Sequence, residues 1–451
     1  LIELCLTMAY DAKVNFMDVL GSTKYWDILI YNFLLKKNIV IPQKRKSEKS
    51  EKFEGAYVKD PQVGIHKWVM SFDLNSLYPH LIMQYNISPE TLVAQDKVKD
   101  MTVDKLLNKE VDTSILKGVT ITPNGALFKT TQRGFLPEIM QTMYDDRVKY
   151  KKLMLQAKQD YEDTKNPKLL KDISKYNNIQ MAKKISLNSA YGAIGNNWFR
   201  YYDLLVAEAI TTSGQLSIRW IESAVNNYLN GLLKTDNEDY VVASDTDSIY
   251  VVFDKLVDMV FKKEQRPSKV ISFLDSVARD KIEPFINKSY QSLHQYVNSY
   301  EQKMQMSREV IADKGIWTAK KRYILNVWDN EGVKYKEPQL KIMGIEAVKS
   351  STPEPCREKI KEGLKIIMNG TEKELNTFIQ KFREEFMTLP PEEIAYPRSV
   401  NGLSKFSDSN QLFAKGAPIH VKGAILYNHL VRKNKLSNKY PYILEGDKIK
   451  F

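Results

Sequence analysis

Residues 240–253 read YVVASDTDSIYVVF, two apolar runs around the polar centre Asp245-Thr246-Asp247. Short runs of β-branched and aromatic residues on both sides of a polar turn are typical of a strand–turn–strand hairpin. Because side chains alternate along an extended backbone, Asp245 and Asp247 would lie on the same side of the chain. The stretch therefore predicts a hairpin, with either an ordinary turn, in which Asp is a favoured residue, or a paired-carboxylate site at its tip.

A third acid ends a second strand. Trp68 to Asp73 form a short apolar run that closes on a carboxylate, which is typical of a buried strand. Clustered carboxylates need cations, and Mg²⁺ prefers oxygen ligands together with substrate phosphates. Two such ions can bind the attacking and the leaving oxygen of a phosphoryl transfer. Asp73 and the hairpin acids together therefore favour a metal-dependent reaction on a phosphate ester.

The residues that follow Asp73 are suited to a nucleotide. Small polar groups and backbone N–H donors around Asn75 and Ser76 can bind a triphosphate, and the bulky ring of Tyr78 follows directly. A ring beside a sugar can exclude a 2′-hydroxyl, the group that separates RNA from DNA precursors. Considered alone, Tyr78 would be an ordinary core tyrosine.

Residues 138–190 contain no glycine and one proline, Pro167, and predict two antiparallel helices that meet near Asn166-Pro167. On the first helix Arg147 and Lys151 are four residues apart and share a face. On the second helix a stripe combines a cation, an amide and an aromatic ring: Lys184, Asn188 and Tyr191. The stripe fits either a nucleotide surface or a solvated basic face. A third helix is expected over about residues 203–233.

The composition agrees with a polyanionic partner. The chain has 451 residues, of which 43% are hydrophobic, and a formal net charge of +12. It can therefore form a sizeable core, and its charge favours nucleic acid over an acidic membrane. Two cysteines argue against a disulfide scaffold or a zinc module. No apolar run is long enough for a membrane span, and the first residue, Leu1, suggests a piece of a longer protein.

Five motifs resemble those of the family B DNA polymerases, and the resemblance is strongest to the replicative polymerases of T-even-type bacteriophages. They are SFDLNSLYP (71–79), KKISLNSAYGAIGN (183–196), SDTDS (244–248), KKRY (320–323) and LKIMGIE (340–346). The resemblance implies an α+β multidomain fold, a right-hand polymerase with an antiparallel-sheet palm, helical-hairpin fingers and a partial helical thumb. The implied segments are an exonuclease end and linker (1–62), palm (63–135), fingers (136–196), palm again (197–345) and truncated thumb (346–451).

The resemblance also implies roles for individual residues. Asp73, Asp245 and Asp247 would be catalytic, and Asp73, Asp247 and Leu74 would bind two Mg²⁺ ions, for which Mn²⁺ could substitute. The dNTP site would contain Ser76, Leu77, Tyr78, Arg147, Lys151, Lys184 and Asn188, while Tyr191 and Gly192 would lie under the nascent base pair. The primer–template contacts would come from Tyr57, Lys320, Lys321, Tyr323 and Lys341, and Glu309 would be a further acid near the metals.

The expected activity is template-directed transfer of dNTPs to a primer 3′-hydroxyl in phage DNA replication, in the cytoplasm of an infected host cell. A catalytically weak or silent relative that only binds primer–template, and an RNA-copying polymerase, are the alternatives. The expected partners are primer–template DNA, dNTPs, and a sliding clamp and replisome proteins that bind through regions outside the chain.

The chain departs from the family pattern at several positions. Ser244 replaces the usual glycine before the paired acids, and its side chain is expected to narrow the room for the primer terminus. His80 stands where serine is common, and we interpret it as filling space. The segment between Lys151 and Lys184 is short for phage fingers, so a trimmed tip is expected. Residues 1–62 lack the Tyr-x-x-x-Asp exonuclease pattern, which predicts that any proofreading residues lie upstream.

Overall fold

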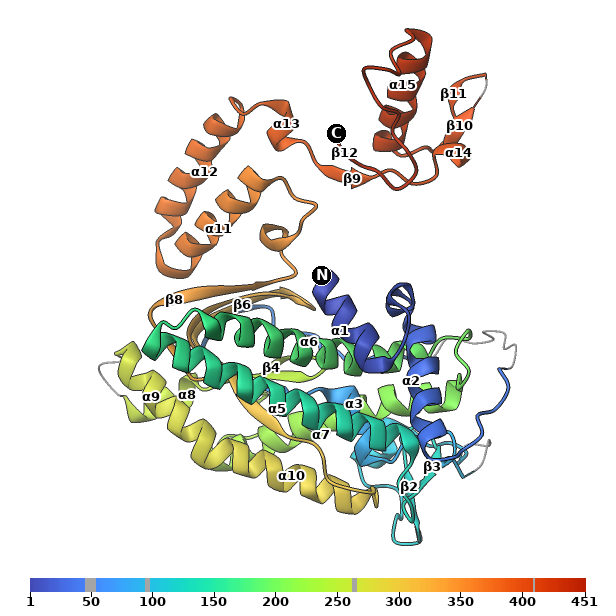
Figure 1. Cartoon of the computed structure of the whole chain (residues 1–451). Coiled ribbons are helices and arrows are strands. Elements are labelled where there is room, and N and C mark those ends of the chain that lie inside the picture. Colours follow the sequence, from blue (N-terminus) through green and yellow to red (C-terminus); the bar gives the residue numbers. More distant parts are fainter. Residues whose placement is uncertain (45–53, 94–97, 262–265, 409) are drawn as a thin grey trace. The chain divides into compact units, whose positions relative to one another are not determined.

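The computed structural model describes residues 1–44, 54–93, 98–261, 266–408 and 410–451 (Figure 1). They form two compact units. The first contains Leu1–Gln62, Lys67–Ile311 and Asp329–Lys334, and the second contains Val63–His66, Ala312–Trp328 and Tyr335–Phe451. Most of the polar stretch at 43–52 in the sequence lies outside the described residues.

A six-stranded sheet has the strand order β4-β5-β1-β6-β7-β8. In chain order the strands are β1 (Gly64–Leu74), β4 (Val241–Asp245), β5 (Ser248–Val252), β6 (Met306–Ala319), β7 (Arg322–Asn330) and β8 (Val333–Met343). Strands β1, β6, β7 and β8 each contain residues of both units. The last three of these strands follow one another closely in the sequence, from Met306 to Met343.

The predicted hairpin is confirmed, and it pairs with the predicted buried strand. β4 is antiparallel to β5, and β5 is antiparallel to β1, with Phe72 opposite Ile249 and Asp73 opposite Ser248. Residues 68–72 are all buried, which explains why this stretch is a continuous apolar run without a polar alternation. The register places the end of β1 beside the turn between β4 and β5.

The predicted helical hairpin is also confirmed. α5 (Phe135–Thr164) and α6 (Lys168–Ile194) pack against each other along their lengths, as Figure 1 shows. α5 ends in a left-handed residue, Lys165, whose N–H donates to the carbonyl of Tyr161 at 2.7 Å. Pro167 then precedes the first turn of α6, where its missing N–H costs no hydrogen bond.

The third predicted helix, α7 (Leu204–Leu233), is confirmed to within one residue, and Asp203 caps it by accepting from the N–H groups of Leu205 and Val206. α7 packs against β4 and β5 and against the helices α3, α4 and α10. The other elements of the first unit are α1 (Ile2–Ala12), η1 (Phe16–Leu20), α2 (Ser22–Lys36), α3 (Leu77–Gln84), α4 (Val103–Leu107), β2 (Val119–Ile121), β3 (Leu127–Lys129), α8 (Asp254–Val260), α9 (Pro267–Val277), η2 (Ala278–Ile282) and α10 (Glu283–Tyr296).

The second unit has two small cores. One joins the sheet to α11 through Ile324, Ile345 and Leu364, and the other packs α15 through Val400, Val421 and Ile425. Its elements after β8 are η3 (Glu346–Val348), α11 (Glu354–Asn369), α12 (Glu372–Phe386), α13 (Pro391–Ile394), β9 (Pro397–Ser399), α14 (Leu403–Phe406), β10 (Ser407–Asp408), β11 (Leu412–Phe413), α15 (Ile419–Lys433) and β12 (Lys448–Lys450). Among the residues described in either unit, no helix is long and apolar enough to cross a membrane.

Candidate active site

A cavity in the first unit brings together most of the residues singled out in the sequence. Its lining comes from the end of β1, the start of α3, one face of each hairpin helix, the β4–β5 turn and the β7–β8 turn. The lining residues are Asp73, Leu74, Asn75, Ser76, Leu77, Tyr78, Pro79, Arg147, Lys151, Lys184, Asn188, Thr246, Asp247 and Glu331. Segments far apart in the sequence therefore share one polar cavity.

Two of the predicted carboxylates, Asp73 and Asp247, line this cavity. The N–H of Leu74 donates to the backbone carbonyl of Asp247 at 2.8 Å, which ties the end of β1 to the hairpin turn. Asp245 ends β4, and its carboxylate accepts from the hydroxyl of Thr246 at 3.2 Å. Asp245 does not belong to the described lining of the cavity, so the structure groups two of the three acids there.

The cations reach the cavity from both hairpin helices. Arg147 and Lys151 project from α5, and Lys184 and Asn188 project from α6, as the helical spacing predicted. Arg147 donates from Nη1 to the hydroxyl of Ser76 at 3.0 Å, which connects α5 to the start of α3. Burial lowers the pKa of the Arg147 guanidinium, and its Nε is buried with no hydrogen-bond partner among the described residues.

The start of α3 faces the same cavity. Ser76 precedes this eight-residue helix with a left-handed backbone, φ 49°. The first N–H groups of any helix have no partner within the helix and carry a partial positive charge. The N-terminus of α3 and the Arg147 side chain therefore give this part of the cavity donors for an anion.

Two tyrosines lie next to these donors. The rings of Tyr78 and Tyr191 have centroids 4.8 Å apart, and burial, with smaller contributions from Tyr191 and Asp247, raises the pKa of Tyr78 to about 12. Gly192 borders open space, because a Cβ atom added there would meet nothing within 4 Å. His80 is buried and packs edge-on against Tyr144, in agreement with its interpretation as a space-filling residue.

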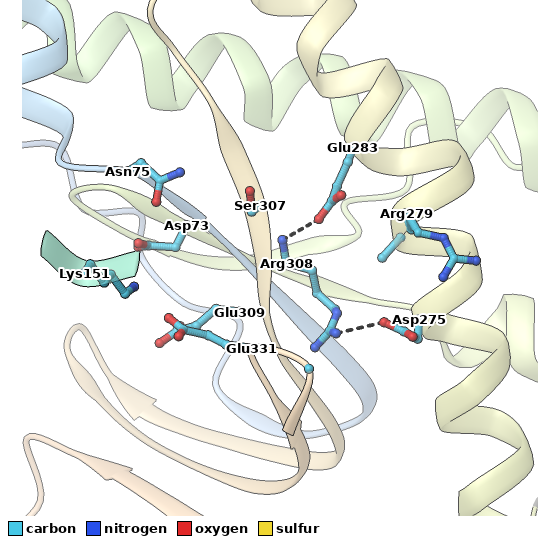
Figure 2. A pocket seen from close by; sticks show the side chains of 12 residues that line it. Asp73, Asn75, Lys151, Asp275, Arg279, Glu283, Ser307, Arg308, Glu309 and Glu331 are labelled. Atoms are coloured by element: carbon cyan, nitrogen blue, oxygen red, sulfur yellow. Dashed lines mark hydrogen bonds and ion pairs between the residues drawn. The ribbon is translucent and has the colours of Figure 1, made fainter. Parts of the chain in front are cut away.

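A second cavity shares Asp73, Asn75, Lys151 and Glu331 with the first (Figure 2). Glu309 also lines it, and its carboxylate accepts from the hydroxyl of Ser71 at 3.3 Å. Figure 2 shows the Glu309 and Glu331 side chains next to each other, and the N–H of Glu331 donates to the carbonyl of Glu309 at 2.7 Å. The predicted acid Glu309 thus lies in a cavity with Asp73, and Glu331 is an acid that the sequence analysis missed.

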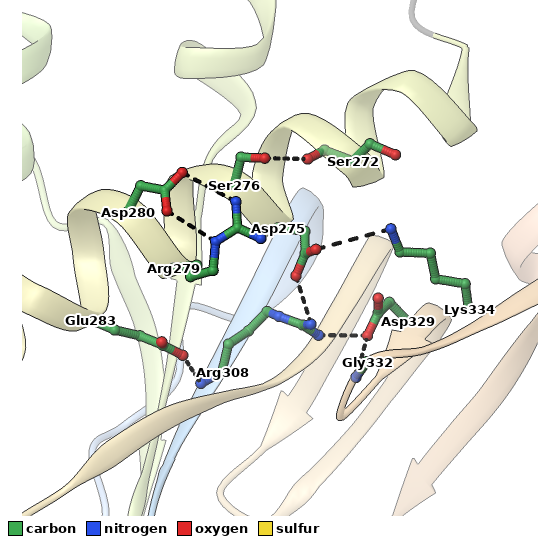
Figure 3. Close-up of polar contacts among 10 residues, drawn as sticks. All are labelled: Ser272, Asp275, Ser276, Arg279, Asp280, Glu283, Arg308, Asp329, Gly332 and Lys334. Carbon is green, nitrogen blue, oxygen red and sulfur yellow. Dashed lines mark hydrogen bonds and ion pairs between the residues drawn. The ribbon is translucent and has the colours of Figure 1, made fainter.

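A network of polar contacts around the buried Arg308–Asp329 ion pair holds the turn that carries Glu331 (Figure 3). Arg308 donates to Asp329 at 2.6 Å and to Asp275 at 2.8 Å, and its backbone N–H donates to Glu283 at 2.7 Å. Asp329 also accepts from the N–H of Gly332 at 2.9 Å. This network was missed as well, because its members lie on separate elements and share no local pattern.

Side chains of helix α2 form hydrogen bonds with side chains of α6, the helix that carries Lys184. The Tyr25 hydroxyl and the Ser186 hydroxyl are 2.7 Å apart and buried, and Trp26 Nε1 donates to the hydroxyl of Ser189 at 2.9 Å. Lys183, next to Lys184, is buried and forms ion pairs with Asp11 of α1 and Asp146 of α5. The two neighbouring lysines therefore differ in role. Lys183 joins α6 to α1 and α5 through ion pairs, whereas Lys184 lines the cavity.

The profile of "DNA polymerase family B" matches residues 20–264. The chain belongs to this family. The DNA-directed DNA polymerase of Escherichia phage RB69 is 36% identical and that of Enterobacteria phage T4 is 33% identical, each over 99% of this chain and 54% of its own length. The DNA polymerase delta catalytic subunit of Arabidopsis thaliana is 30% identical over 48% of this chain and 18% of its own length. The chain thus spans about half the length of these phage relatives.

Family B polymerases generally use divalent metal ions, and this family B chain presents two carboxylates in its polar cavity.

The residues predicted to contact primer–template DNA lie outside the lining of this cavity. Tyr57 contacts the β4–β5 turn through its carbonyl, which accepts from the N–H of Thr246 at 3.2 Å. Lys320, Lys321, Tyr323 and Lys341 belong to the second unit.

Two of the family B motifs meet within the second unit. Gly344 of LKIMGIE has a φ of 67°, and a Cβ atom there would lie 2.0 Å from the carbonyl oxygen of Lys321 in KKRY. Only glycine fits this close approach. The ring of Tyr323 is buried and stacks on Trp317, with centroids 5.7 Å apart. Its predicted contact with a primer stays a prediction.

Proposed function

We propose that the chain catalyses template-directed DNA synthesis, in which a primer 3′-hydroxyl attacks the α-phosphate of a dNTP and pyrophosphate leaves. The observation that carries the proposal is one cavity lined by Asp73 and Asp247 together with Arg147, Lys151 and Lys184. Acids that can bind metal ions and cations that can bind a triphosphate are the two requirements of phosphoryl transfer. The family B membership and the similarity to two phage DNA-directed DNA polymerases support the same reaction.

The donor set fits Mg²⁺. Asp73 and Asp247 supply carboxylate oxygens, and Leu74, whose backbone N–H donates to the carbonyl of Asp247 at 2.8 Å, also lines the cavity. Among the described residues, no group of three or more His, Cys, Asp or Glu side chains is placed to hold a metal ion. Mg²⁺ is commonly bound by one or two carboxylates and completed by substrate phosphates and water, so two acids are sufficient. When bound, two Mg²⁺ ions would neutralise the charge that develops on the phosphate oxygens.

The side chains around the acids would position the dNTP. Arg147, Lys151 and Lys184 would bind the triphosphate, and the backbone N–H groups at Ser76 and Leu77 would add donors at the start of α3. Asn188 would support the same face of α6. Nη1 of Arg147 donates to the hydroxyl of Ser76 at 3.0 Å, which holds the guanidinium beside the start of α3. These groups would hold the reacting phosphate in line with the primer terminus.

The aromatic pair would select the sugar and support the base. Tyr78 would exclude a 2′-hydroxyl, and Tyr191 with the open space at Gly192 would face the nascent base pair. Asp245 would help to position the primer end. Tyr57, Lys320, Lys321, Tyr323 and Lys341 would contact the primer–template duplex, in a palm, fingers and thumb arrangement. A sliding clamp and replisome proteins are the partners proposed for the whole protein.

The test is single-nucleotide and multi-nucleotide primer extension by the purified chain with Mg²⁺ at low ionic strength. DNA and RNA templates are compared, each with dNTPs and then rNTPs, and Asp73→Asn is the inactive control. We expect extension on the DNA template with dNTPs that Asp73→Asn abolishes. Duplex binding without extension would support the silent relative and reject the proposal, and a preference for the RNA template would support an RNA-copying enzyme.

A further inference from the structure

The segment Tyr57–Gln62, here called the strap, runs along the edge strand β4. The N–H of Thr246 donates to the carbonyl of Tyr57 at 3.2 Å, and the N–H of Gln62 donates to the carbonyl of Val242 at 2.9 Å. Between them, the N–H of Lys59 donates to the side-chain hydroxyl of Ser244 at 3.3 Å. The strap therefore contacts every second residue of β4 up to the turn that carries Asp245 and Asp247.

The turn needs such support. Thr246 has a φ of 58°, a left-handed conformation that β-branched residues rarely adopt. Strained residues persist where the surrounding structure holds them, and they cluster at functional sites. The Tyr57 carbonyl holds the N–H of Thr246, the residue between the two acids of the motif. Movement of the strap would therefore move Asp247 relative to Asp73.

Lys59 anchors the strap to two other elements. Its ammonium lies 2.7 Å from Glu222 Oε1, on α7, and 2.7 Å from Asp239 Oδ2, in the segment that leads into β4. Only 12% of the Lys59 side chain is exposed. Asp239 also accepts from the side-chain amide of Asn226 at 2.8 Å, and Gln62 Nε2 donates to the Asp239 carbonyl at 2.8 Å. The ammonium thus joins the strap, α7 and the start of β4.

The hydroxyl of Ser244 is the acceptor that completes the strap's contact with β4. Ser244 is buried, with 2% of its surface exposed. Glycine, the residue usual at this position in the resembling motif, has no hydroxyl to accept the N–H of Lys59. The serine that replaces this glycine therefore has a hydrogen-bond partner within the chain, the N–H of Lys59.

We propose that Lys59 is a positioning residue, which holds the Asp245–Asp247 turn through the strap, and that the hydroxyl of Ser244 is the specific acceptor on β4 for the backbone N–H of Lys59. The inference rests on the proposed polymerase function, because it assigns to the strap the alignment of Asp247 with Asp73 for metal binding. Lys59 itself touches neither acid in the described contacts. Loss of the Lys59 side chain should weaken metal binding more than it weakens dNTP or duplex binding.

The experiment compares Lys59→Met, Lys59→Arg and Ser244→Ala with the unsubstituted chain. Lys255→Met is the matched control, because Lys255 forms an exposed ion pair with Glu238 at 2.6 Å, one residue from Asp239. The half-saturating Mg²⁺ concentration of single-nucleotide extension is measured at saturating dNTP, and the half-saturating dNTP concentration at saturating Mg²⁺. Mn²⁺ binding to the chain on a dideoxy-terminated primer–template with dNTP is followed by electron paramagnetic resonance, which needs no turnover.

We expect Lys59→Met to raise the half-saturating Mg²⁺ concentration and to weaken Mn²⁺ binding about tenfold, since a buried charge contact is lost. Ser244→Ala should raise the half-saturating Mg²⁺ concentration and weaken Mn²⁺ binding about threefold, the effect of one neutral hydrogen bond. The half-saturating dNTP concentration should stay within about twofold of the parent value, and Lys59→Arg should recover most of the metal affinity, because a guanidinium keeps the charge.

The outcomes separate the two proposals. Extension by the parent chain with unchanged metal dependence in Lys59→Met and Ser244→Ala would overturn the strap proposal and leave the polymerase function intact. Equal weakening of metal, dNTP and duplex binding would also overturn it, because that pattern indicates general unfolding. If Lys59→Met does not fold, Ser244→Ala decides alone. A parent chain without extension would overturn both proposals.

Discussion

The ring of Tyr78 at the start of α3 packs against the ring of Tyr191 on α6, with centroids 4.8 Å apart and planes inclined by 60°. The contact links α3, which follows the strand that carries Asp73, to the helix that carries Lys184. Both rings are partly buried, and burial raises the pKa of each hydroxyl, so both stay neutral at physiological pH. Two neutral rings can contact a sugar and a base through their size and packing, and they add no charge to the site.

Replacing Tyr78 with alanine should admit ribonucleotides. The variant Tyr78→Ala removes the ring that would clash with a 2′-hydroxyl, so the ratio of rNTP to dNTP incorporation should rise by about tenfold or more. Tyr191→Ala is the comparison, since it removes the packing partner and leaves the Tyr78 ring, and its ratio should rise less. The ratio is measured by single-nucleotide extension with each triphosphate. An unchanged ratio in Tyr78→Ala would mean that the ring serves packing alone.

The two cavity carboxylates should be indispensable for chemistry. Asp73→Asn and Asp247→Asn each remove a charged metal ligand while keeping the size of the side chain, so extension should fall at least about 10³-fold. Primer–template affinity, measured by fluorescence anisotropy, should change less than about twofold, because it depends mainly on cation contacts to phosphates. Asp236→Asn, at an exposed position, is the control. Substantial extension by either variant would contradict the metal assignment.

Lys184 should act on nucleotide capture. Lys184→Ala removes a cation from the cavity, and the half-saturating dNTP concentration should rise about tenfold, the value of one charge-assisted contact to a phosphate. Lys175→Ala removes an exposed lysine from the same helix and should leave it unchanged. Duplex affinity should be equal in both variants. If the dNTP dependence of Lys184→Ala matches that of Lys175→Ala, the stripe is a solvated basic face.

Arg308 should be a major source of stability in the first unit. Its side chain is 8% exposed and pairs with Asp329, which is fully buried. Arg308→Met would leave that carboxylate without its charged partner, and the free energy of unfolding should fall by about 3–5 kcal/mol. The double variant Arg308→Met with Asp329→Asn should recover part of the loss, because it no longer buries an unpaired charge. Equilibrium denaturation in urea measures both, and a loss below about 1 kcal/mol, the value of an exposed pair, would contradict the assignment.

Local patterns were sufficient for the elements that carry the site. The Asp-Thr-Asp hairpin, the buried strand that carries Asp73 and the break at Asn166-Pro167 are all confirmed, and the strand ends one residue beyond Asp73, at Leu74. Each depends on neighbours in the chain, through turn chemistry, apolar runs and the conformational limits of proline. The helical period also placed Arg147 with Lys151, and Lys184 with Asn188, and the structure puts all four side chains in one cavity.

Other features were decided by tertiary structure alone. The ammonium of Lys59 reaches Glu222 and Asp239, and the guanidinium of Arg308 reaches Asp275 and Asp329. Glu331 enters the site because its turn is tied to Glu309. In the sequence these residues look like ordinary charged surface positions. Their partners are set by which strands pair and which helices cover them, and no local periodicity records a pairing between distant segments.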